Sequence, residues 1–361
     1  MRLLHVGFNL DGAMGDNFIE LTKAFQDRYN NLVFVLTKKS FKKSDISSQQ
    51  ILELNYNKNN FFGLLKDLKL IDQFINKNKI DIILFSTPNL IYNIYISLRF
   101  KNIKKVYYLH DPIPHTGEKI FRKFLLNLQN KILVKKSNKV LVASKYLRKI
   151  AINRYTKEKG KIEVVELGLL SNMQFPELRD DNSIKENIDL LFFGRLEEYK
   201  GLNLLGETIH NITKEGININ CTIIGKGDIE ALVDKEYIKY FDVINKYIPD
   251  KNLALYIKQS KVIVFPYINA TGTQAIQIAY YYKKPVIASN VGCFNDYVQN
   301  NKTGLLFETG NPNDLAKKIK DLLIAPEKRK LFGEEGSKML ERKFELKNIM
   351  EKYERIFSEI K

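Results

Sequence analysis

The chain has 361 residues, of which 44% are hydrophobic and 27% charged, and its formal net charge is +17. This length suits two domains with a core each, and the composition excludes a largely disordered chain. No apolar run reaches the roughly 18 to 20 residues of a membrane-spanning helix, and the first residues lack a secretory signal pattern. We therefore expect a cytoplasmic protein whose membrane contact is peripheral.

The first half of the chain alternates short apolar runs with longer amphipathic segments. Helical spacing of apolar residues runs over 17–28, 64–76 and 120–136. Strands are expected at residues 3–7, 32–36, 51–54, 82–86, 106–109, 140–143 and 162–165. Because several of these strands are apolar on both faces, the pattern predicts an α/β domain with a parallel sheet over residues 1–170.

The second half restarts this alternation after a polar segment, residues 171–187, which is expected to act as a linker. Strands are expected at residues 190–194, 219–225, 243–245, 262–266, 286–289 and 305–307. The pattern predicts a second Rossmann-like α/β domain over 171–344. The helical tail, about 345–361, has no strand left to cover, and its periodicity leaves open whether it packs back on the first domain.

Two features of the first half are weak signals by themselves. Gly12 and Ala13 lie between the first strand and a helix expected to begin near Asn17, and glycine there permits close backbone approach to a ligand. An ordinary strand-to-helix turn has the same composition. His110 follows the strand at 106–109, where a lone histidine is more often structural than catalytic.

Residues 192–202 carry the most specific motif. An apolar strand ends in Gly194 and Arg195, and a helix is expected to begin near Lys200. Ligands bind at the carboxyl ends of parallel strands, where a helix N-terminus offers free N–H groups to an anion. Arg195 and Lys200 add two positive charges of the kind that stabilise a departing diphosphate.

This string, Gly-Arg-Leu followed after three residues by Lys-Gly, resembles the phosphate-binding signature of the family 4 retaining glycosyltransferases. Four further segments resemble later landmarks of that family in the same order: 221–227, 247–256, 284–292 and 302–307. The resemblance implies the GT-B fold, in which two Rossmann-like domains face each other across a cleft. It also implies retaining transfer of a hexose-type sugar from a nucleotide diphosphate sugar to a lipid-linked or polysaccharide acceptor, as in bacterial surface polysaccharide synthesis.

The resemblance assigns roles to particular residues. Arg195 and Lys200 would stabilise the leaving diphosphate, and His110 would contact the donor sugar near the reacting carbon. Cationic side chains in this role imply that no cofactor or metal is required. The resemblance also implies that the donor binds at the following residues: Gly12, Ala13, Gly194, Gly225, Tyr247 and Ile248.

One departure from the family concerns two glutamates eight residues apart, whose positions fall on Ala270 and Ile278. We expect the segment between them to bind the donor instead, through Thr271, Gly272, Thr273, and Gln274 or Gln277. The alternative is an inactive nucleotide-sugar-binding subunit that lost its carboxylates. A nucleotide-sugar epimerase is less favoured, because the cleft offers few acid–base carboxylates.

The excess charge lies in the first half. Residues 1–170 hold 30 Lys and Arg against 14 Asp and Glu, and residues 119–161 hold 14 basic residues and one acidic residue. Such a field attracts phosphate-rich surfaces, either nucleic acid or anionic lipid. No reader motif for nucleic acid accompanies it, so we expect an anionic membrane partner, as for similar enzymes.

The helix expected at 120–136 is the centre of this basic region. An apolar stripe on this helix, from Phe121 to Leu133, is expected to pack on the sheet as in an ordinary surface helix. The basic side chains expected to face the membrane or the acceptor are Lys119, Arg122, Lys123, Lys131, Lys135 and Lys136.

Overall fold

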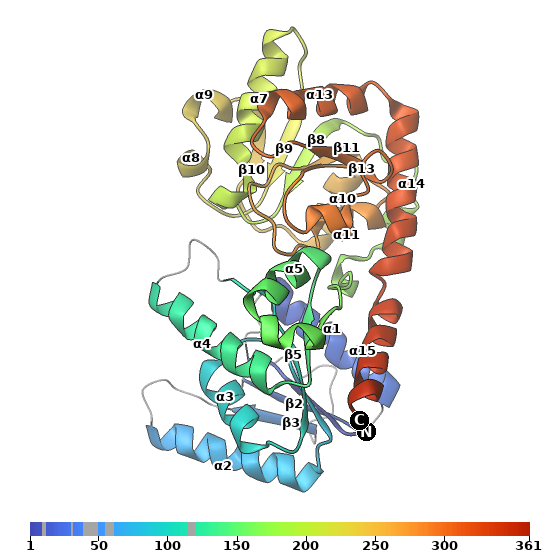
Figure 1. Ribbon diagram of the computed structural model, residues 1–361. Helices are drawn as coiled ribbons and strands as arrows, with labels where there is room; N and C mark the ends of the chain where they lie inside the picture. Colours follow the sequence, from blue (N-terminus) through green and yellow to red (C-terminus); the bar gives the residue numbers. More distant parts are fainter. Residues whose placement is uncertain (9–11, 30–31, 39–49, 55–60, 114–119) are drawn as a thin grey trace. The chain divides into compact units, whose positions relative to one another are not determined.

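The computed structural model describes residues 1–8, 12–29, 32–38, 50–54, 61–113 and 120–361. They form two compact units (Figure 1). Unit 1 comprises Met1–Leu167 and Leu346–Lys361, and unit 2 comprises Gly168–Glu345. The domain boundary was expected after residue 170, and the structure has it after Leu167.

Unit 1 is built on a seven-stranded sheet in the order β3-β2-β1-β4-β5-β6-β7, with every pair parallel. Its strands are β1 (Leu3–Val6), β2 (Val33–Lys38), β3 (Ile51–Leu54), β4 (Ile82–Phe85), β5 (Lys104–Tyr108), β6 (Lys139–Val142) and β7 (Ile162–Val164). Apolar residues on both faces of the central strands are buried, as expected of a parallel sheet that is covered on two sides.

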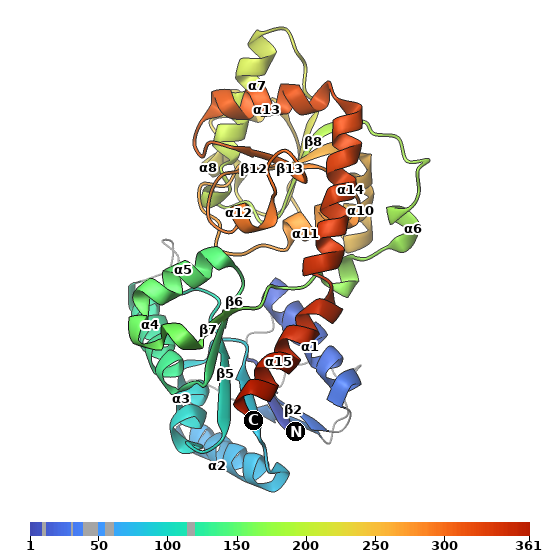
Figure 2. The ribbon, with the colours of Figure 1, turned by 45° about the vertical axis from the view of Figure 1, so that its right-hand side comes forward.

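In the described part of this unit, the longer helices that cover the sheet are α1 (Gly12–Tyr29), α2 (Phe61–Asn78), α3 (Leu90–Arg99), α4 (Ile120–Lys136), α5 (Lys145–Arg154) and α15 (Leu346–Ile360). Helices α1 and α15 lie side by side on one face, and α2, α3 and α4 lie on the other (Figures 1 and 2).

The C-terminal helix α15 packs on unit 1, which settles the point that its periodicity left open. The rings of Tyr353 and Phe357 pack on Phe25 of α1 at centroid distances of 5.2 and 5.8 Å. An ion pair also joins Arg355 to Glu163 of β7 at 2.6 Å. The end of the chain therefore completes the core formed by its beginning.

Unit 2 is built on a six-stranded parallel sheet in the order β10-β9-β8-β11-β12-β13. Its strands are β8 (Ile188–Phe193), β9 (Cys221–Ile224), β10 (Phe241–Ile244), β11 (Ser260–Phe265), β12 (Val286–Ser289) and β13 (Gly304–Phe307). Its helices are α6 (Pro176–Arg179), α7 (Leu202–Lys214), α8 (Ile229–Leu232), α9 (Lys235–Ile238), α10 (Asp250–Gln259), α11 (Ala275–Tyr281), α12 (Phe294–Tyr297), α13 (Pro312–Leu323) and α14 (Pro326–Lys343). The prediction of two parallel α/β domains is confirmed.

The interpretation of residues 171–187 as a linker is wrong. This segment lies wholly inside unit 2, where it forms a short 3-10 turn and the helix α6. Met173 is buried, and its carbonyl accepts a hydrogen bond from the Tyr282 hydroxyl at 2.9 Å. Few apolar residues suffice to hold a segment against an existing core, and their spacing in this segment shows no period.

Candidate functional site

The carboxyl ends of β8, β9 and β10 meet at a cluster of glycines in unit 2. Gly194 has a φ of 133° and donates its N–H to Ile224 at 2.9 Å. A Cβ on Gly225 would lie 1.8 Å from the Gly194 carbonyl oxygen, so the two backbones approach closer than any side chain permits. Gly194 itself is exposed, which leaves its backbone open to a ligand.

Lys200 occupies the short 3-10 helix η5 (Glu198–Lys200) between β8 and α7. Its side chain is only 8% exposed, and its Nζ lies 3.9 Å from the ring centroid of Tyr267 and 4.7 Å from that of Tyr199. Burial lowers the pKa of Lys200 to about 8, although the charge of nearby Glu197 opposes this shift. The structure records no hydrogen bond or ion pair for this ammonium among the described residues, so it retains capacity for an anion.

Gly201 brings the start of α7 against the end of β11. Its φ is 69°, and a Cβ there would lie 2.0 Å from the carbonyl oxygen of Pro266. The N–H of Ile268 donates to the carbonyl of Tyr199 at 2.8 Å and fixes the same junction. The N-terminus of the 13-residue helix α7, an anion-binding feature, therefore lies next to Lys200.

Arg195 lies in the loop after β8 with its side chain 77% exposed. Its Nη1 is 3.0 Å from a carboxylate oxygen of Glu197. An ion pair this exposed contributes only about 0 to 1 kcal/mol, so a diphosphate can replace the carboxylate at little cost. Arg195 and Lys200 thus present an accessible and a buried cation on the same loop.

The segment after β11 contains the positions of the two expected glutamates. Ala270 is buried, and its carbonyl accepts the N–H of Cys293 at 2.9 Å. Gly272 is exposed with open space around it, and Thr271 and Thr273 are half-buried. The Thr273 hydroxyl accepts the Ala275 N–H at 3.1 Å at the start of α11. Backbone at Gly272 and the half-buried Thr271 are therefore among the accessible polar groups of this loop.

The structure places the side chains of both predicted glutamines away from solvent. Gln274 is buried, and its side-chain amide donates to the Gly168 carbonyl at 2.5 Å. Gln277 lies on α11 and is fully buried. Neither amide faces solvent: Gln277 is buried on α11, and Gln274, which directly precedes this helix, is held by its bond to Gly168.

Two further predicted residues, Tyr247 and Ile248, lie between β10 and α10. Tyr247 is exposed, and its hydroxyl donates to Asp250 at 3.4 Å. Ile248 is partly buried and packs against the core of unit 2. The backbone of this segment is held in place while its tyrosine remains open to solvent.

Three of the predicted site residues, His110, Gly12 and Ala13, lie in unit 1. His110 lies just beyond β5, half-buried, and its Nε2–H donates to the Ser86 carbonyl at 2.6 Å. Burial lowers the pKa of His110, and the bond to Ser86 partly offsets this effect, so the ring is neutral near pH 7. Helix α1 begins at Gly12, so the predicted start near Asn17 is wrong, and Gly12 and Ala13 form the first turn of a helix.

Two family models match the chain, one in each half. The model described as Glycosyltransferase Family 4 matches residues 18–169, and the model described as Glycosyl transferases group 1 matches residues 174–339. The chain belongs to the family 4 glycosyltransferases. The resemblance carried by the five sequence motifs is therefore confirmed.

Curated relatives and solved structures are also similar to this chain. The capsular polysaccharide biosynthesis glycosyltransferase CapM of Staphylococcus aureus is 26% identical over 253 residues, which span 66% of this chain and 66% of CapM, just under two thirds of its length. A glycosyltransferase structure from Rickettsia africae matches with a TM-score of 0.76 and 21% identity, covering 99% of this chain and 98% of that one. HepE of Anabaena, in complex with UDP and glucose, matches with a TM-score of 0.72 and 15% identity over 99% and 100% of the two chains. These structural likenesses show the GT-B fold.

The aromatic walls of the Lys200 site in this glycosyltransferase were not predicted. Tyr199 precedes Lys200 directly, and a tyrosine beside a motif lysine is the one local signal available. Tyr267 follows β11, and only the folded arrangement of β8 and β11 brings it to the lysine. Tyr199 and Tyr267 also contact each other edge to face, with ring centroids 5.9 Å apart.

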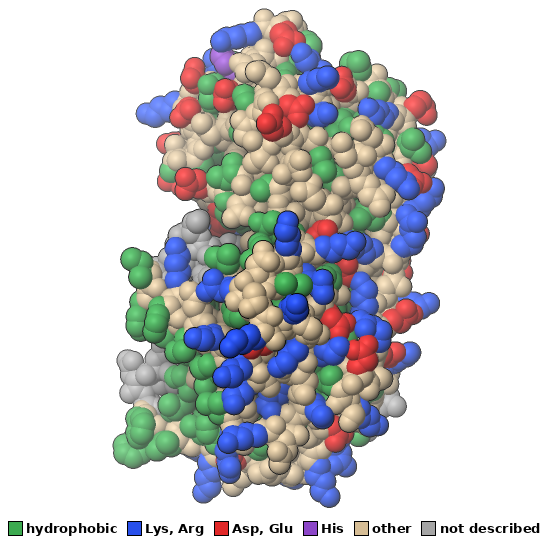
Figure 3. All heavy atoms as spheres, viewed as in Figure 1, with side chains coloured by type: hydrophobic (Ala, Val, Ile, Leu, Met, Phe, Trp, Pro, Cys, Tyr) green, Lys and Arg blue, Asp and Glu red, His purple; other side chains and the backbone are tan. Residues whose placement is uncertain are grey.

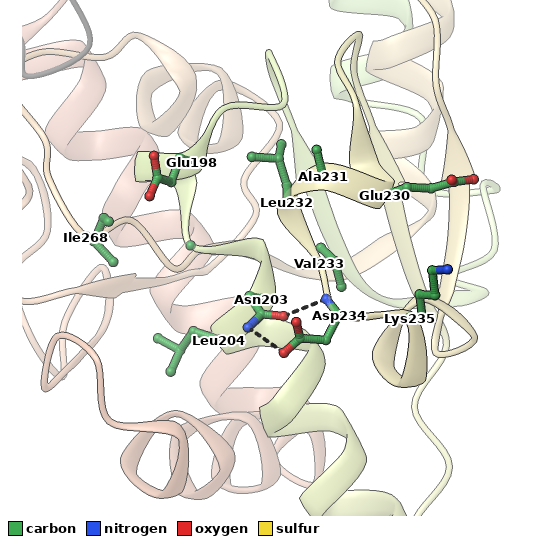
Figure 4. Close-up of a pocket in the computed structure, with 11 residues that line it drawn as sticks. Glu198, Asn203, Leu204, Glu230, Ala231, Leu232, Val233, Asp234, Lys235 and Ile268 are labelled. Carbon is green, nitrogen blue, oxygen red and sulfur yellow. Dashed lines mark hydrogen bonds between the residues drawn. The ribbon is translucent and has the colours of Figure 1, made fainter.

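A pocket of about 730 Å³ lies beside the start of α7, between η5 and helices α8 and α9 (Figure 4). Asn203 and Asp234, which both line it, are joined by two hydrogen bonds of 3.1 and 2.9 Å. Glu198 and Ile268 line its opposite side (Figure 4). None of the residues predicted to bind the donor lines this pocket.

The predicted basic surface of unit 1 lies on α4. Lys119 falls outside the described residues. Arg122, Lys131, Lys135 and Lys136 are exposed, and Lys123 is half-buried.

The prediction that the apolar stripe of α4 packs on the sheet is wrong for the first turns of the helix. Phe121 is 72% exposed and Phe124 is 63% exposed, whereas Leu133 and Val134 are buried. Only the C-terminal half of α4 covers the core, because its buried residues begin at Gln129. Periodicity identified the stripe but not what covers it.

Exposed apolar side chains of α2, α3 and α4 gather on one side of unit 1, with Lys and Arg side chains beside them (Figure 3). We call this the apolar–basic face. Its exposed apolar members are Phe61, Phe62, Leu65, Ile91, Leu98, Ile120, Phe121, Phe124 and Leu128.

Two absences hold for the part of the chain that the structure describes. There, no three His, Cys, Asp or Glu side chains are grouped as a metal site would require. None of the helices in those residues is both long and apolar enough to cross a membrane.

Proposed function

We propose that this glycosyltransferase moves a hexose-type sugar from a nucleotide diphosphate sugar to a lipid-linked or polysaccharide acceptor in surface polysaccharide synthesis. CapM is named for capsular polysaccharide biosynthesis, which supports the acceptor class. HepE was solved with UDP and glucose, which supports the donor class.

The observation that carries the proposal is the Lys200 site. A buried ammonium between two tyrosine rings, with no recorded anionic contact in the described chain, matches a phosphate group in charge and in demand for hydrogen bonds. Arg195 supplies a second cation from the same loop. Together they can neutralise a leaving diphosphate.

The proposed reaction retains the configuration of the sugar. The bond between the anomeric carbon and the diphosphate oxygen breaks while the acceptor hydroxyl oxygen forms a new bond on the same face. The hydroxyl proton passes to the departing phosphate oxygen. This path requires no protein nucleophile, and Arg195 and Lys200 stabilise the charge that develops on the diphosphate. His110 and the backbone at Gly272 would position the sugar.

Donor hydrolysis without an acceptor tests the proposal. Purified protein is incubated with UDP-, GDP- and dTDP-sugars, and free sugar and nucleotide are measured. We expect slow release from one donor, reduced by about 100-fold in Arg195→Ala and in Lys200→Met, the usual scale for one preorganised charged donor. Lys200→Met keeps the length of the buried side chain and removes its charge.

The second candidate function is an inactive nucleotide-sugar-binding subunit. It is favoured by Ala270 and Ile278 at the glutamate positions and by the burial of Gln274 and Gln277. Donor binding in a thermal-shift assay, with no sugar release from any donor, would establish this function and reject the transferase.

We propose that transfer requires no metal ion, because Arg195 and Lys200 supply the positive charge that a cation would supply. Incubation with EDTA should leave turnover within about twofold, and added magnesium should not raise it. A tenfold loss with EDTA that magnesium restores would contradict this proposal.

We also propose that the apolar–basic face docks on an anionic membrane, where a lipid-linked acceptor lies. Its support is the combination on one face of exposed phenylalanines and exposed lysines. Aromatic side chains enter the interfacial region of a bilayer while basic side chains pair with lipid phosphates.

A further inference from the structure

Two histidines of unit 1 are connected through one serine. His5 lies in β1 and is fully buried, and Ser86 directly follows β4. The Ser86 hydroxyl lies 2.6 Å from Nε2 of His5, and the Ser86 carbonyl lies 2.6 Å from Nε2 of His110. A buried histidine in the centre of a parallel sheet is therefore linked, through Ser86, to the histidine that we propose contacts the donor.

The direction of these hydrogen bonds follows from the available hydrogens. The Thr22 hydroxyl donates its one hydrogen to the Phe18 carbonyl at 2.7 Å, so it accepts from Nδ1–H of His5 at 2.8 Å. Burial lowers the pKa of His5 to about 3, so its ring is neutral and its Nε2 carries no hydrogen. The Ser86 hydroxyl must then donate to this nitrogen.

The same reasoning gives the direction of the hydrogen bond between His110 and Ser86. A carbonyl oxygen only accepts, so Nε2 of His110 carries a hydrogen. Because the His110 ring is neutral near pH 7, its Nδ1 is a bare acceptor. No other hydrogen bond to this ring is recorded among the described residues. The hydrogen bonds therefore all point the same way, from His110 through Ser86, His5 and Thr22 to Phe18.

The turn after β4 is held at several points besides His5. The Ser86 N–H donates to Val6 at 3.0 Å, and the Thr87 hydroxyl accepts the Phe8 N–H at 2.7 Å. Asn93 donates to the Thr87 carbonyl at 2.9 Å. His5 adds a contact to the Ser86 side chain itself, which contributes with these bonds to the placement of the adjoining carbonyl.

We propose that His5 is a positioning residue for glycosyl transfer, which acts through Ser86 to hold His110 as its Nε2–H tautomer. The Nδ1 of His110 is then the atom that accepts a hydroxyl hydrogen of the donor sugar. The inference rests on the proposed role of His110 at the donor and names the group that prepares it.

Two substitutions of His5 separate its two hydrogen bonds. The side-chain oxygen of Gln reaches as far as Nε2 and can accept from Ser86, whereas the shorter Asn reaches only as far as Nδ1 and can donate to Thr22. We expect His5→Asn and Ser86→Ala to lower kcat by about 10- to 100-fold, the scale of a slightly misplaced group, with KM for the acceptor unchanged. His5→Gln should restore most of kcat, and the double variant His5→Asn with Ser86→Ala should be no slower than either single one.

The tautomer of His110 provides a readout that does not depend on turnover. The chain has four histidines, so ring ¹⁵N shifts can be assigned by single substitution. Without donor, wild type and His5→Gln should show the Nε2–H tautomer of His110, and His5→Asn and Ser86→Ala a mixture. His210→Asn is the matched control, because His210 bonds to the Tyr240 hydroxyl at 2.7 Å in unit 2. It should change neither kcat nor the His110 signal.

Equal losses of kcat in His5→Asn and His5→Gln, with the His110 tautomer unchanged in both, would show that His5 only stabilises the fold and would overturn the inference. Wild-type turnover by His110→Ala would also overturn it, while leaving glycosyl transfer intact. Absence of transfer in the wild type would instead reject the proposed function.

Discussion

At the scale of single residues, burial of the Lys200 ammonium lowers the stability of the free protein and favours the binding of an anion. Removal of an ammonium from water disfavours its charged form, and the described residues offer it two aromatic faces and no carboxylate contact. Cation–π contacts return about 0.5 to 2 kcal/mol each, which leaves part of the cost uncompensated. A bound phosphate offsets the remaining free-energy cost of burying the ammonium. Burial of Lys200 therefore strengthens the binding of a donor that carries phosphate.

The pH dependence of donor affinity tests this reasoning. The pKa of Lys200 is lowered to about 8, so its charge is present at pH 7 and is lost as pH rises above 8. Nucleoside diphosphate affinity should be constant below about pH 7.5 and fall towards tenfold per pH unit above 8. The measurement is calorimetric titration from pH 6.5 to 9.5. Lys200→Met should bind weakly with a flat profile, and an equal slope in this variant would assign the pH dependence to another group.

At the scale of elements, the predicted bounds were most accurate for strands whose residues are buried on both faces of the sheet. Strand β12, which is buried throughout, was predicted to the residue, because a short apolar run bounded by polar loops has one way to bury itself. Helix ends were less predictable: α1 starts at Gly12, although glycine is a poor helix former and the helix was expected to begin near Asn17.

The candidate site was predictable only as far as its motif is local. Arg195 and Lys200 followed from contiguous sequence, whereas Tyr267 reaches the lysine through strand pairing that no spacing encodes. The side chains of Gln274 and Gln277 were expected to face the donor. The burial of Gln277 depends on how α11 is rotated, which a seven-residue helix with few polar residues leaves ambiguous. The burial of Gln274 depends on a bond to Gly168, 106 residues away in the sequence.

Gly201 offers a test of the junction that sets Lys200 in place. Gly201→Ala must adopt a φ near 69° and also displace the Pro266 carbonyl, which would lie 2.0 Å from the new Cβ. Gly216 is the matched control, because its φ is 85° and the space around it is open. Left-handed backbone costs alanine about 1 to 2 kcal/mol, so Gly216→Ala should lower Tm by several degrees.

Gly201→Ala should lower Tm further than Gly216→Ala and should weaken donor binding, which the control should not. Melting curves and calorimetry with a nucleoside diphosphate measure the two effects. Equal Tm losses, with donor affinity intact in both variants, would mean that the β11–α7 junction is not close-packed.

At the scale of the whole molecule, the charge is divided between the halves of the chain. Residues 1–170 carry a net charge of +16, and residues 171–361 hold 28 basic against 27 acidic residues. Neither the fold nor the leaving-group chemistry requires the excess in the first half. That half also bears the apolar–basic face, where exposed Phe121 and Phe124 on α4 adjoin exposed lysines. Two kinds of attraction to a bilayer, one screened by salt and one not, therefore lie on one face.

This combination predicts a two-component response to salt. The protein should co-sediment with anionic vesicles and bind neutral ones poorly. Raising salt from 0.1 to 1 M shortens the screening length from about 10 to about 3 Å, which should weaken binding without abolishing it. Charge reversal at Lys131, Lys135 and Lys136 should remove the salt-sensitive part, because each basic residue near the surface is worth about 1 kcal/mol.

Phe121→Ser with Phe124→Ser should remove the part of vesicle binding that persists at 1 M salt, because apolar insertion is not screened by ions. The matched control in unit 2 is Ile324→Ser with Lys317→Glu, where both side chains are exposed and Ile324 is 81% so. It should bind vesicles like the wild type.

All variants should keep their rate on a short water-soluble acceptor, since the proposed leaving-group residues lie in unit 2. The α4 variants should lose activity on a lipid-linked acceptor in vesicles. Complete release of the wild type at 1 M salt would leave charge as the sole attraction, and equal binding to neutral and anionic vesicles would remove the electrostatic component while leaving the transferase assignment intact.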